Sequence, residues 1–449
     1  MKIAVIGGGG FRVPMLDRSL AWVADAVGVD EVVLYDVSEW RLRLIGDVLR
    51  AVDDERGVGS PRRMTTDVDD ALDGAGAVLA AIRVGGNAGR IVDETVPIEL
   101  GVLGQETVGP GGIAFALRTL PVMRHLAAVA AVRAPDAWFL NFTNPAGLVT
   151  EALQQQLGDR AVGICDSPIS LCRAVAAALG ETTGALTFDY AGLNHLGWLF
   201  TARKDDLDRL PELLNGARAT DVEEIRLFGI DRVRELGMIP NEYLAYYERA
   251  DAIVRAFRER GAARGQIVEQ QQSAFFEGRY DSPADTLRGW RRARDARHAT
   301  YMDEAGGDRI APVDEDRAAD APEDEGYGAV AAAVLRAIAT GARERLILNT
   351  ANRGRLPFLD DAAVIEAPTL VGREGAAPVP VGALRDDQRE LVARVKEVER
   401  LTIRASTERS SSLAIEAIAT HPVVDSRPMA ERIFEGYIAR QPGFADLFA

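Results

Sequence analysis

Short apolar runs recur through the first 200 residues, and each leads into Gly, Asp, Asn or Cys. Helix-length stretches separate these runs, which in chain order are KIAVIGG, EVVLYDV, GAVLAAIRVGG, AWFLNFTNP, RAVGICDSP and LTFDYAGLNHLGWLF. Continuous apolar strands that alternate with helices are typical of a parallel sheet covered on both faces. Ligands of such sheets bind beyond the carboxyl ends of the strands. We therefore expect an α/β fold with a Rossmann-like, doubly wound sheet and functional residues along one edge.

The second half of the chain has a different pattern, in which helix-forming stretches dominate. Because 449 residues exceed one typical core, we expect two domains. Residues 1–200 would form the Rossmann-like domain, and residues 201–449 a mainly helical α+β domain for substrate binding, catalysis and subunit contacts. The charged stretch 281–326, in which arginines lead and acids follow, predicts a mobile insertion that acts as a lid or a subunit contact.

The net charge of −16 argues against nucleic acid and anionic membranes as partners. An anionic small substrate would therefore need a local basic pocket. Two cysteines cannot form a disulfide framework, which favours a reducing compartment. The start of the chain lacks the features of a signal peptide, and no run of about 18 apolar residues is present. We expect a cytoplasmic protein.

A glycine-rich turn, AVIGGGGFRVP, follows the first apolar run. Gly7 and Gly9 would let the backbone turn tightly and approach a pyrophosphate at a helix N-terminus. Arg12 stands where a third glycine is usual. Asp36 ends the second run, where a carboxylate binds both ribose hydroxyls of NAD and repels a 2′-phosphate. The alternative is a tight turn that binds no ligand.

Cys165 and His195 each follow a predicted strand, so both side chains could face the same crevice. Thiolate and imidazole suit a divalent metal whose remaining positions are filled by substrate and water. A lone cysteine is, however, usually a packed small side chain, and a lone histidine is usually hydrogen-bonded in the core. The same pair would also permit nucleophilic catalysis by the thiol. Their spacing does not separate these alternatives.

One tyrosine and three arginines complete the candidates. Tyr243, in IPNEYLAYYERAD, stands near the start of a predicted helix and could extend into the crevice. A tyrosine acts as a base near neutral pH only when neighbouring positive charge lowers its pKa. Arg83, Arg90 and Arg264 are suited to bidentate recognition of phosphate or carboxylate. The alternative is packing for the tyrosine and surface exposure for the arginines.

Eight longer motifs follow one another along nearly the full length of the chain: KIAVIGGGG, RVGGNAGRIVDETVPIELGVLGQETVGPGG, NFTNPAGLVTEAL, GICDSP, GLNHLGW, PNEYLAYY, ARGQIVE and LNTANRGRLPFLDD. In this order they resemble glycoside hydrolase family 4, the NAD- and divalent-metal-dependent glycosidases. The resemblance is greatest to the members that cleave 6-phospho-β-glucosides. It implies a lactate/malate-dehydrogenase-like fold, NAD and Mn²⁺ as cofactors, a phosphorylated sugar glycoside as substrate, and a homodimer or homotetramer.

The resemblance also implies roles for individual residues. Cys165 and His195 match the metal ligands, and Tyr243 matches the catalytic base. The remaining matches concern the two ligands: Gly7, Gly9, Gly10, Asp36, Arg83 and Asn144 on the cofactor side, and Asn144, Arg90 and Arg264 on the substrate side, with Arg264 the better candidate for a 6-phosphate.

The implied mechanism oxidises the sugar at C3 with NAD⁺, so that the metal-polarised ketone acidifies the C2 proton. Tyr243 removes this proton, and the C1–oxygen bond breaks by elimination. Water then adds to the enone, and the retained NADH restores C3. No net turnover of cofactor is expected.

Two departures from the family pattern keep alternatives open. Asp166 follows Cys165, as in relatives that cleave 6-phospho-α-glucosides, whereas the β-specific relatives have Asn there. Asp166 would then protonate the leaving oxygen or support the metal. The Arg-Gly-Gly stretch typical of members acting on phosphorylated sugars is replaced by DEGYG around Tyr327. A net NAD-dependent 2-hydroxy-acid dehydrogenase and a silent NAD-binding sensor are further alternatives, against which the Cys165, His195 and Tyr243 set argues.

Overall fold

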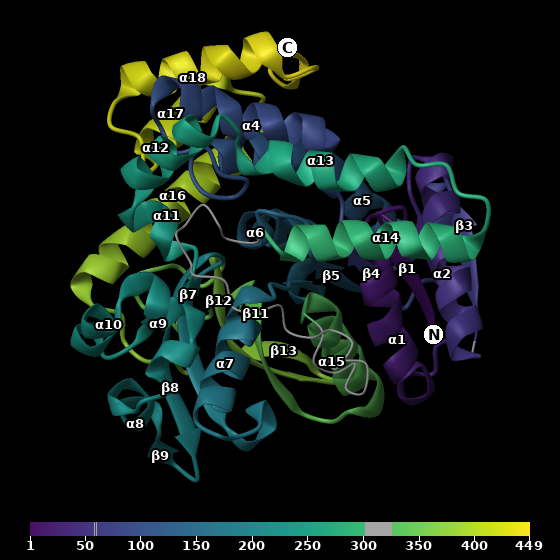
Figure 1. Ribbon diagram of the computed structural model, residues 1–449, viewed down its shortest axis with the longest axis horizontal. Coiled ribbons are helices and arrows are strands. Elements are labelled where there is room, and N and C mark those ends of the chain that lie inside the picture. The colour runs from purple at the N-terminus through teal and green to yellow at the C-terminus, as the bar shows by residue number, and fades with distance from the viewer. Residues whose placement is uncertain (58, 60, 301–325) are drawn as a thin grey trace.

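The computed structural model describes residues 1–57, 59, 61–300 and 326–449. A single mixed sheet of thirteen strands runs through this described part of the chain (Figure 1), in the order β10-β8-β7-β12-β11-β6-β5-β4-β1-β2-β3, with β13 beside β12 and β9 beside β8. The strands are β1 (Lys2–Ile6), β2 (Glu31–Tyr35), β3 (Arg62–Thr65), β4 (Ala77–Ala80), β5 (Trp138–Asn141), β6 (Ala161–Gly163), β7 (Thr187–Leu193), β8 (Leu196–Lys204), β9 (Leu207–Asp208), β10 (Ile239–Pro240), β11 (Glu344–Ala351), β12 (Val364–Gly372) and β13 (Gly375–Pro378).

The strands β3, β2, β1, β4, β5 and β6 are parallel and lie in the order of the doubly wound dinucleotide-binding fold. Their central members are buried because helices cover both faces of the sheet. The predicted Rossmann-like sheet is therefore confirmed. The helices of this half are α1 (Val13–Val27), α2 (Glu39–Arg56), α3 (Val68–Leu72), α4 (Gly86–Leu100), α5 (Pro110–Arg133), α6 (Ala146–Leu157) and α7 (Ser167–Ala178).

The last apolar run, LTFDYAGLNHLGWLF, is two antiparallel strands and not one strand of the parallel sheet. Between β7 and β8 the chain reverses at Asn194 and His195, and His195 adopts a left-handed backbone with φ of 62°. At Gly192 a Cβ atom would lie 2.1 Å from the carbonyl oxygen of Leu196, so the hairpin needs glycine there. The prediction failed because both strands are largely buried, which makes their apolar residues look like one continuous run.

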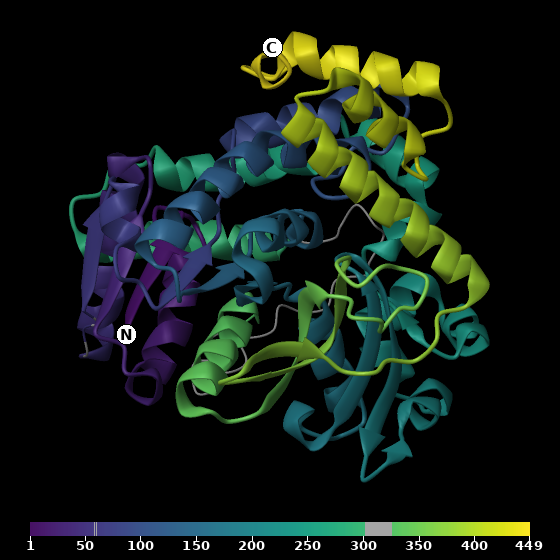
Figure 2. The same cartoon turned by 180° about the vertical axis from the view of Figure 1, so that it is seen from behind.

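Helices dominate the second half, as expected, and the strands β11 to β13 return to the same sheet. Described strands from both sides of residue 200 thus share one sheet, and the two-domain division stays a prediction. Three long helices, α16, α17 and α18, pack together at one end of the molecule beside α4 (Figure 2). The helices are α8 (Leu210–Asn215), α9 (Glu223–Phe228), α10 (Ile230–Leu236), α11 (Leu244–Glu248), α12 (Ala250–Arg260), α13 (Arg264–Phe276), α14 (Pro283–His298), α15 (Gly326–Thr340), α16 (Asp386–Glu408), α17 (Ser411–Thr420) and α18 (Arg427–Arg440).

The first part of the charged stretch 281–326 forms the helix α14, which packs against α2 and α13 (Figure 1). Leu287, Trp290 and Ala293 are buried, and the Trp290 indole donates a hydrogen bond to the Phe11 carbonyl oxygen at 2.8 Å. The prediction of a mobile insertion is wrong for this helix, because three apolar residues at helical spacing bury one narrow face. The rest of the predicted insertion, residues 301–325, lies outside the described residues.

Within the described chain, α5 is the one helix long and apolar enough to cross a membrane by length and composition. It packs against α3, α4, α6 and α16, and 67% of its apolar window is buried inside the protein. Burial in the core accounts for its composition.

Candidate active site

A cleft of about 710 Å³ opens beyond the carboxyl ends of the parallel strands. Every residue that the sequence nominated lines it, although the roles given to them stay predictions: Gly7, Gly9, Gly10, Asp36, Arg83, Arg90, Asn144, Cys165, Asp166, His195, Tyr243 and Arg264. These residues come from loops after β1, β2, β4, β5, β6 and β7, and from α4, α13 and the start of α11. One cleft therefore collects residues from position 7 to position 264.

The glycine-rich loop forms a floor free of side chains between β1 and α1. Gly7 has φ of 91°, and a Cβ atom there would lie 2.5 Å from the Ala81 carbonyl oxygen. A Cβ atom on Gly9 would lie 2.6 Å from the Cβ of Arg41. These close approaches require glycine, and they leave backbone facing the cleft at the N-terminus of α1. Such a floor fits a pyrophosphate.

The Asp36 carboxylate lies beside this floor at the end of β2. It accepts hydrogen bonds from the backbone N–H of Gly9 at 3.1 Å and of Ser38 at 2.9 Å. Val37 and Val122 are exposed and line the same part of the cleft. A fixed carboxylate with apolar neighbours fits the ribose and adenine of a dinucleotide.

Cys165 and His195 line the cleft from the loop after β6 and from the β7–β8 turn. Burial raises the pKa of the Cys165 thiol well above its usual value, and the Glu366 and Asp166 carboxylates add to the effect. Burial lowers the pKa of His195 to about 4, so its imidazole is neutral near pH 7. Neutral imidazole is the metal-binding form, and a buried thiol beside carboxylates ionises when a cation compensates its charge.

Among the residues that the structure describes, no group of three or more His, Cys, Asp and Glu side chains could hold a metal ion. A metal held by Cys165 and His195 would therefore take its other ligands from substrate and water. This donor set fits an open catalytic site and not a closed structural one.

The buried carboxyl group of Glu366, on β12, is hydrogen-bonded to the β7–β8 turn. It accepts hydrogen bonds from Asn194 Nδ2, Tyr190 Oη and Asn349 Nδ2 at 3.2, 3.2 and 3.0 Å. Burial raises its pKa to about 7 despite these donors. Sequence reasoning missed this residue, although one acid inside the apolar run VIEAPTLVG was a visible signal.

The Tyr243 ring stacks on the His195 ring, with centroids 3.6 Å apart and planes 3° apart. A cation lies nearby, because the Tyr243 phenol is among the groups that interact with the guanidinium of Arg90. Burial opposes the charged form of Arg90, but Glu106, Glu94 and this phenol together raise its pKa. The cation beside the phenol thus also pairs with the Glu94 and Glu106 carboxylates.

Two of the nominated arginines are already neutralised within the protein. Arg83 and Arg90 both pair with Glu106, and Arg90 Nε also contacts Glu94 Oε1 at 2.7 Å. Burial would raise the pKa of Glu106, but the two arginines overcome it and lower the pKa to about 2. Glu106 was not singled out from the sequence, although it lies in the quoted motif GQETVGPGG.

Two other arginines line the cleft without a carboxylate partner among the described residues. Arg264, at the start of α13, donates from Nη1 to Thr300 Oγ1 at 2.7 Å. On α14, burial and the nearby cations Arg12 and Arg90 lower the pKa of Arg297 to about 9, against the attraction of Glu106. Sequence reasoning missed Arg297 because it placed this arginine-rich segment in a solvated insertion.

Asp166 lines the cleft directly after Cys165 in the chain and pairs with Arg12, which follows the glycine-rich loop. Its Oδ2 is 3.6 Å from Nη1 of Arg12, and both side chains are about two-fifths exposed. Exposed ion pairs contribute little to stability. The carboxylate is therefore held loosely and faces the cleft.

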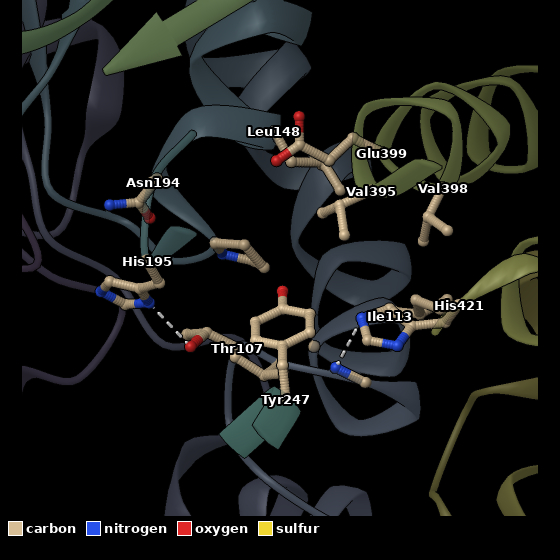
Figure 3. Close-up of a pocket in the computed structure, with 14 residues that line it drawn as sticks. Thr107, Ile113, Leu148, Asn194, His195, Tyr247, Val395, Val398, Glu399 and His421 are labelled. Atoms are coloured by element: carbon tan, nitrogen blue, oxygen red, sulfur yellow. Dashed lines mark hydrogen bonds between the residues drawn. The ribbon is translucent and has the colours of Figure 1, made fainter. Parts of the chain in front are cut away.

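A second, small cavity of about 30 Å³ is also lined by His195 (Figure 3). Thr107, Asn194, Tyr247, Glu399 and His421 are among its lining residues. Thr107 Oγ1 is 2.8 Å from Nδ1 of His195. His195 thus lines both cavities.

Fold and cleft together define an enzyme of the doubly wound, dinucleotide-binding class. The chain belongs to family 4 of the glycosyl hydrolases. The sequence profile described as "Family 4 glycosyl hydrolase" matches residues 2–181, and the profile described as "Family 4 glycosyl hydrolase C-terminal domain" matches residues 190–424. The predicted family is confirmed.

Relatives of known name divide between two specificities. A 6-phospho-beta-glucosidase of Escherichia coli is 29% identical over 100% of this chain and 98% of that protein. A 6-phospho-alpha-glucosidase of Leptotrichia buccalis is 28% identical over 99% of this chain and 98% of that protein. The 6-phospho-beta-glucosidase of Thermotoga maritima, solved with manganese, NAD⁺ and glucose-6-phosphate, has a TM-score of 0.81 and 25% identity, with 99% of each chain covered.

Proposed function

We propose that this chain hydrolyses glycosides of glucose 6-phosphate, with NAD⁺ and a divalent metal ion, Mn²⁺, as cofactors. The main support is that one cleft combines a side-chain-free glycine floor, a Cys–His pair, a phenol beside a cation, and two arginines without a described carboxylate partner. The names of the relatives support a phosphorylated glucoside as substrate.

The cleft divides into a cofactor side and a reaction side. On the cofactor side, the backbone of Gly7 to Gly10 would bind the pyrophosphate and Asp36 the ribose hydroxyls. When bound, NAD⁺ supplies a temporary oxidation at the sugar C3, and the metal supplies Lewis-acid polarisation. Cys165 and His195 would hold the metal, and Asn144 would contact the substrate near the nicotinamide.

On the reaction side, Tyr243 would take the proton from the sugar C2, since its phenol lies beside the Arg90 cation and against His195. Loss of this proton lets the C1–oxygen bond break by elimination, after which water adds at C1. Asp166 would deliver a proton to the leaving oxygen, because it faces the cleft and its ion pair with Arg12 is loose.

Arg264 and Arg297 would bind the 6-phosphate. Arg83 and Arg90 are compensated by Glu106, which leaves these two as the cations that best attract an anion. Arg90 would line the sugar site without binding the phosphate directly. A bound dianion would offset the repulsion that Arg297 meets from Arg12 and Arg90.

For the anomer, we propose a β-linked substrate, on the motif resemblance given above. Asp166 favours a second candidate, a 6-phospho-α-glucosidase, because a carboxyl group in this position suits an acid for the α-linked leaving group. We also propose a cytoplasmic homo-oligomer.

The test is a panel of α- and β-nitrophenyl glucosides, with and without a 6-phosphate, assayed with and without NAD⁺ and Mn²⁺. We expect release of nitrophenol only from a phosphorylated glucoside and only when both cofactors are present. Cys165→Ser should lose this activity. Stoichiometric NADH formation with lactate or malate would instead indicate a dehydrogenase, and NAD⁺ binding without any turnover or Mn²⁺ binding would indicate a sensor.

A further inference from the structure

The His195 imidazole has one hydrogen-bond partner whose own bonding can be worked out in full. Thr107 Oγ1 lies 2.8 Å from His195 Nδ1 and 3.0 Å from Gln105 Oε1 (Figure 3 shows the first of these contacts). A hydroxyl group has a single hydrogen and can donate to only one of the two. The contact that receives this hydrogen decides which ring nitrogen of His195 carries a proton.

The other hydrogen bonds of Gln105 show which atom donates in its contact with the Thr107 hydroxyl. Its Oε1 accepts the backbone N–H of Thr107 at 2.6 Å and that of Val108 at 2.7 Å. Backbone N–H groups only donate, so this atom is the amide oxygen and not the amide nitrogen. An amide oxygen has no hydrogen to give. The Thr107 hydroxyl therefore donates to Gln105.

The hydroxyl oxygen of Thr107 is then left as an acceptor toward His195. Its partner on the ring must be an N–H, which places the hydrogen on Nδ1. A neutral imidazole has only one N–H, so the lone pair lies on Nε2. We infer that Gln105 and Thr107 are positioning residues that hold His195 in the Nδ1–H tautomer and leave Nε2 as the metal-binding atom.

The arrangement of the ring supports this inference. Thr107 lines the small cavity, Cys165 lines the large cleft, and His195 lines both. In Figure 3 the ring turns one nitrogen toward Thr107 and the other away from it. Tyr243 covers a ring face at 3.6 Å, which restricts rotation of the imidazole. The nitrogen that faces away from Thr107 is thus the one available to share an ion with Cys165.

The inference rests on the proposed role of His195 as a metal ligand, but its first half can be tested without metal. The chain has four histidines, so ¹⁵N-histidine labelling gives a simple long-range ¹H–¹⁵N spectrum, and His195→Gln identifies the His195 signals by their loss. In the metal-free wild-type protein we expect the proton on Nδ1 of His195. A proton on Nε2 in that spectrum would overturn the inference.

The second half is tested with Mn²⁺ alone, by measuring free Mn²⁺ from its paramagnetic resonance signal during titration. Thr107→Val keeps the shape of the side chain but offers no acceptor, and we expect its dissociation constant for Mn²⁺ to rise about 10–100-fold. Thr107→Ser restores the acceptor and is expected to stay near the wild-type value. Thr402→Val, at a buried threonine on α16 that lines neither cavity, is the matched control and should leave it unchanged.

The two measurements separate failure of the inference from failure of the proposed function. An unchanged Mn²⁺ affinity in Thr107→Val would overturn the positioning role while the metal site stands. Wild-type protein that binds no Mn²⁺ would instead overturn the metal site itself, whatever the tautomer. Because the tautomer is measured in the wild-type protein and does not depend on the Thr107 variant, the first test stands even if Thr107→Val does not fold.

Discussion

Tyr243 is held in place by contacts of both its ring and its backbone. Its ring lies flat against His195, and its backbone N–H donates to Asn241 Oδ1 at 3.0 Å at the start of α11. A base must be placed within hydrogen-bond reach of the proton it removes, so this restraint is useful only if the phenol can ionise. The Arg90 cation interacts with this phenol, and the same guanidinium pairs with Glu94 and Glu106.

Replacing Tyr243 by Phe removes the proposed base and keeps the stacked ring. We expect kcat to fall by about 10²–10⁴-fold, the range typical for loss of a general base. In deuterium oxide, the wild-type enzyme should place deuterium at C2 of the product sugar, and Tyr243→Phe should lose this exchange. Tyr247→Phe, on the same helix α11, is the control and should retain both. Unchanged exchange in Tyr243→Phe would show that another group removes the proton.

Far from the cleft, Glu224 is a buried carboxyl on α9 whose pKa burial raises to about 7. Because the folded protein holds this proton more tightly than the unfolded chain, its contribution to stability is present below pH 4.5 and lost as pH rises toward 7. Glu224→Gln removes that dependence. Relative to wild type, we expect it to gain up to about 3 kcal/mol in unfolding free energy between pH 4.5 and 8. Urea unfolding of both proteins at several pH values gives this difference, and a constant difference would contradict it.

The place of some candidate residues in the cleft could be predicted, because their motifs put them directly after a strand. Cys165 and His195 are examples. The hydrogen bond between Glu366 and Asn194 could not be predicted, because it spans 172 positions and exists only once β7 and β12 share the sheet. Arg297 was missed for a related reason, since its place in the cleft depends on the packing of α14.

At the scale of elements, α14 shows how a helix rich in charge can be part of the core. Its apolar residues Leu287, Trp290 and Ala293 are too few to mark a helix by composition, but they fall on one face. The parallel strands were easier to predict, because a fully buried strand is an unbroken run of apolar residues. The same property concealed the β7–β8 hairpin, whose turn depends on two residues, Asn194 and His195.

The indole of Trp290 connects α14 to the glycine-rich loop through Phe11. Trp290→Ala would leave a large cavity, and we expect it to lower the unfolding free energy by about 3–5 kcal/mol. Trp290→Phe mainly removes the hydrogen bond and should cost about 1 kcal/mol. Denaturant unfolding measures both, with Arg288→Ala on the exposed side of the same helix as a near-neutral control. A Trp290→Ala cost no larger than that of the control would show that α14 is not part of the core.

At the scale of the whole molecule, the cleft is a local exception to the charge of the chain. The net charge is −16, yet Arg12, Arg83, Arg90, Arg264 and Arg297 all line one cavity. Carboxylates from α4 and the adjoining GQET segment compensate some of these cations and leave others for a ligand. From the sequence, we expected that an anionic substrate would need a local basic pocket. This cavity, with its five arginines, is such a pocket.

Because strands from both halves of the chain share one sheet and both halves line the cleft, a ligand there should stabilise the protein as one unit. NAD⁺ at about 100 times its dissociation constant should add about 2.7 kcal/mol to the unfolding free energy. For a chain of this length that corresponds to a rise of about 3 °C in the midpoint of a single thermal transition, measured by scanning calorimetry. Asp36→Ala would remove the proposed ribose contact, so its midpoint should rise less at the same NAD⁺ concentration. Two separate transitions, of which NAD⁺ moves only one, would show that the halves unfold independently despite the shared sheet.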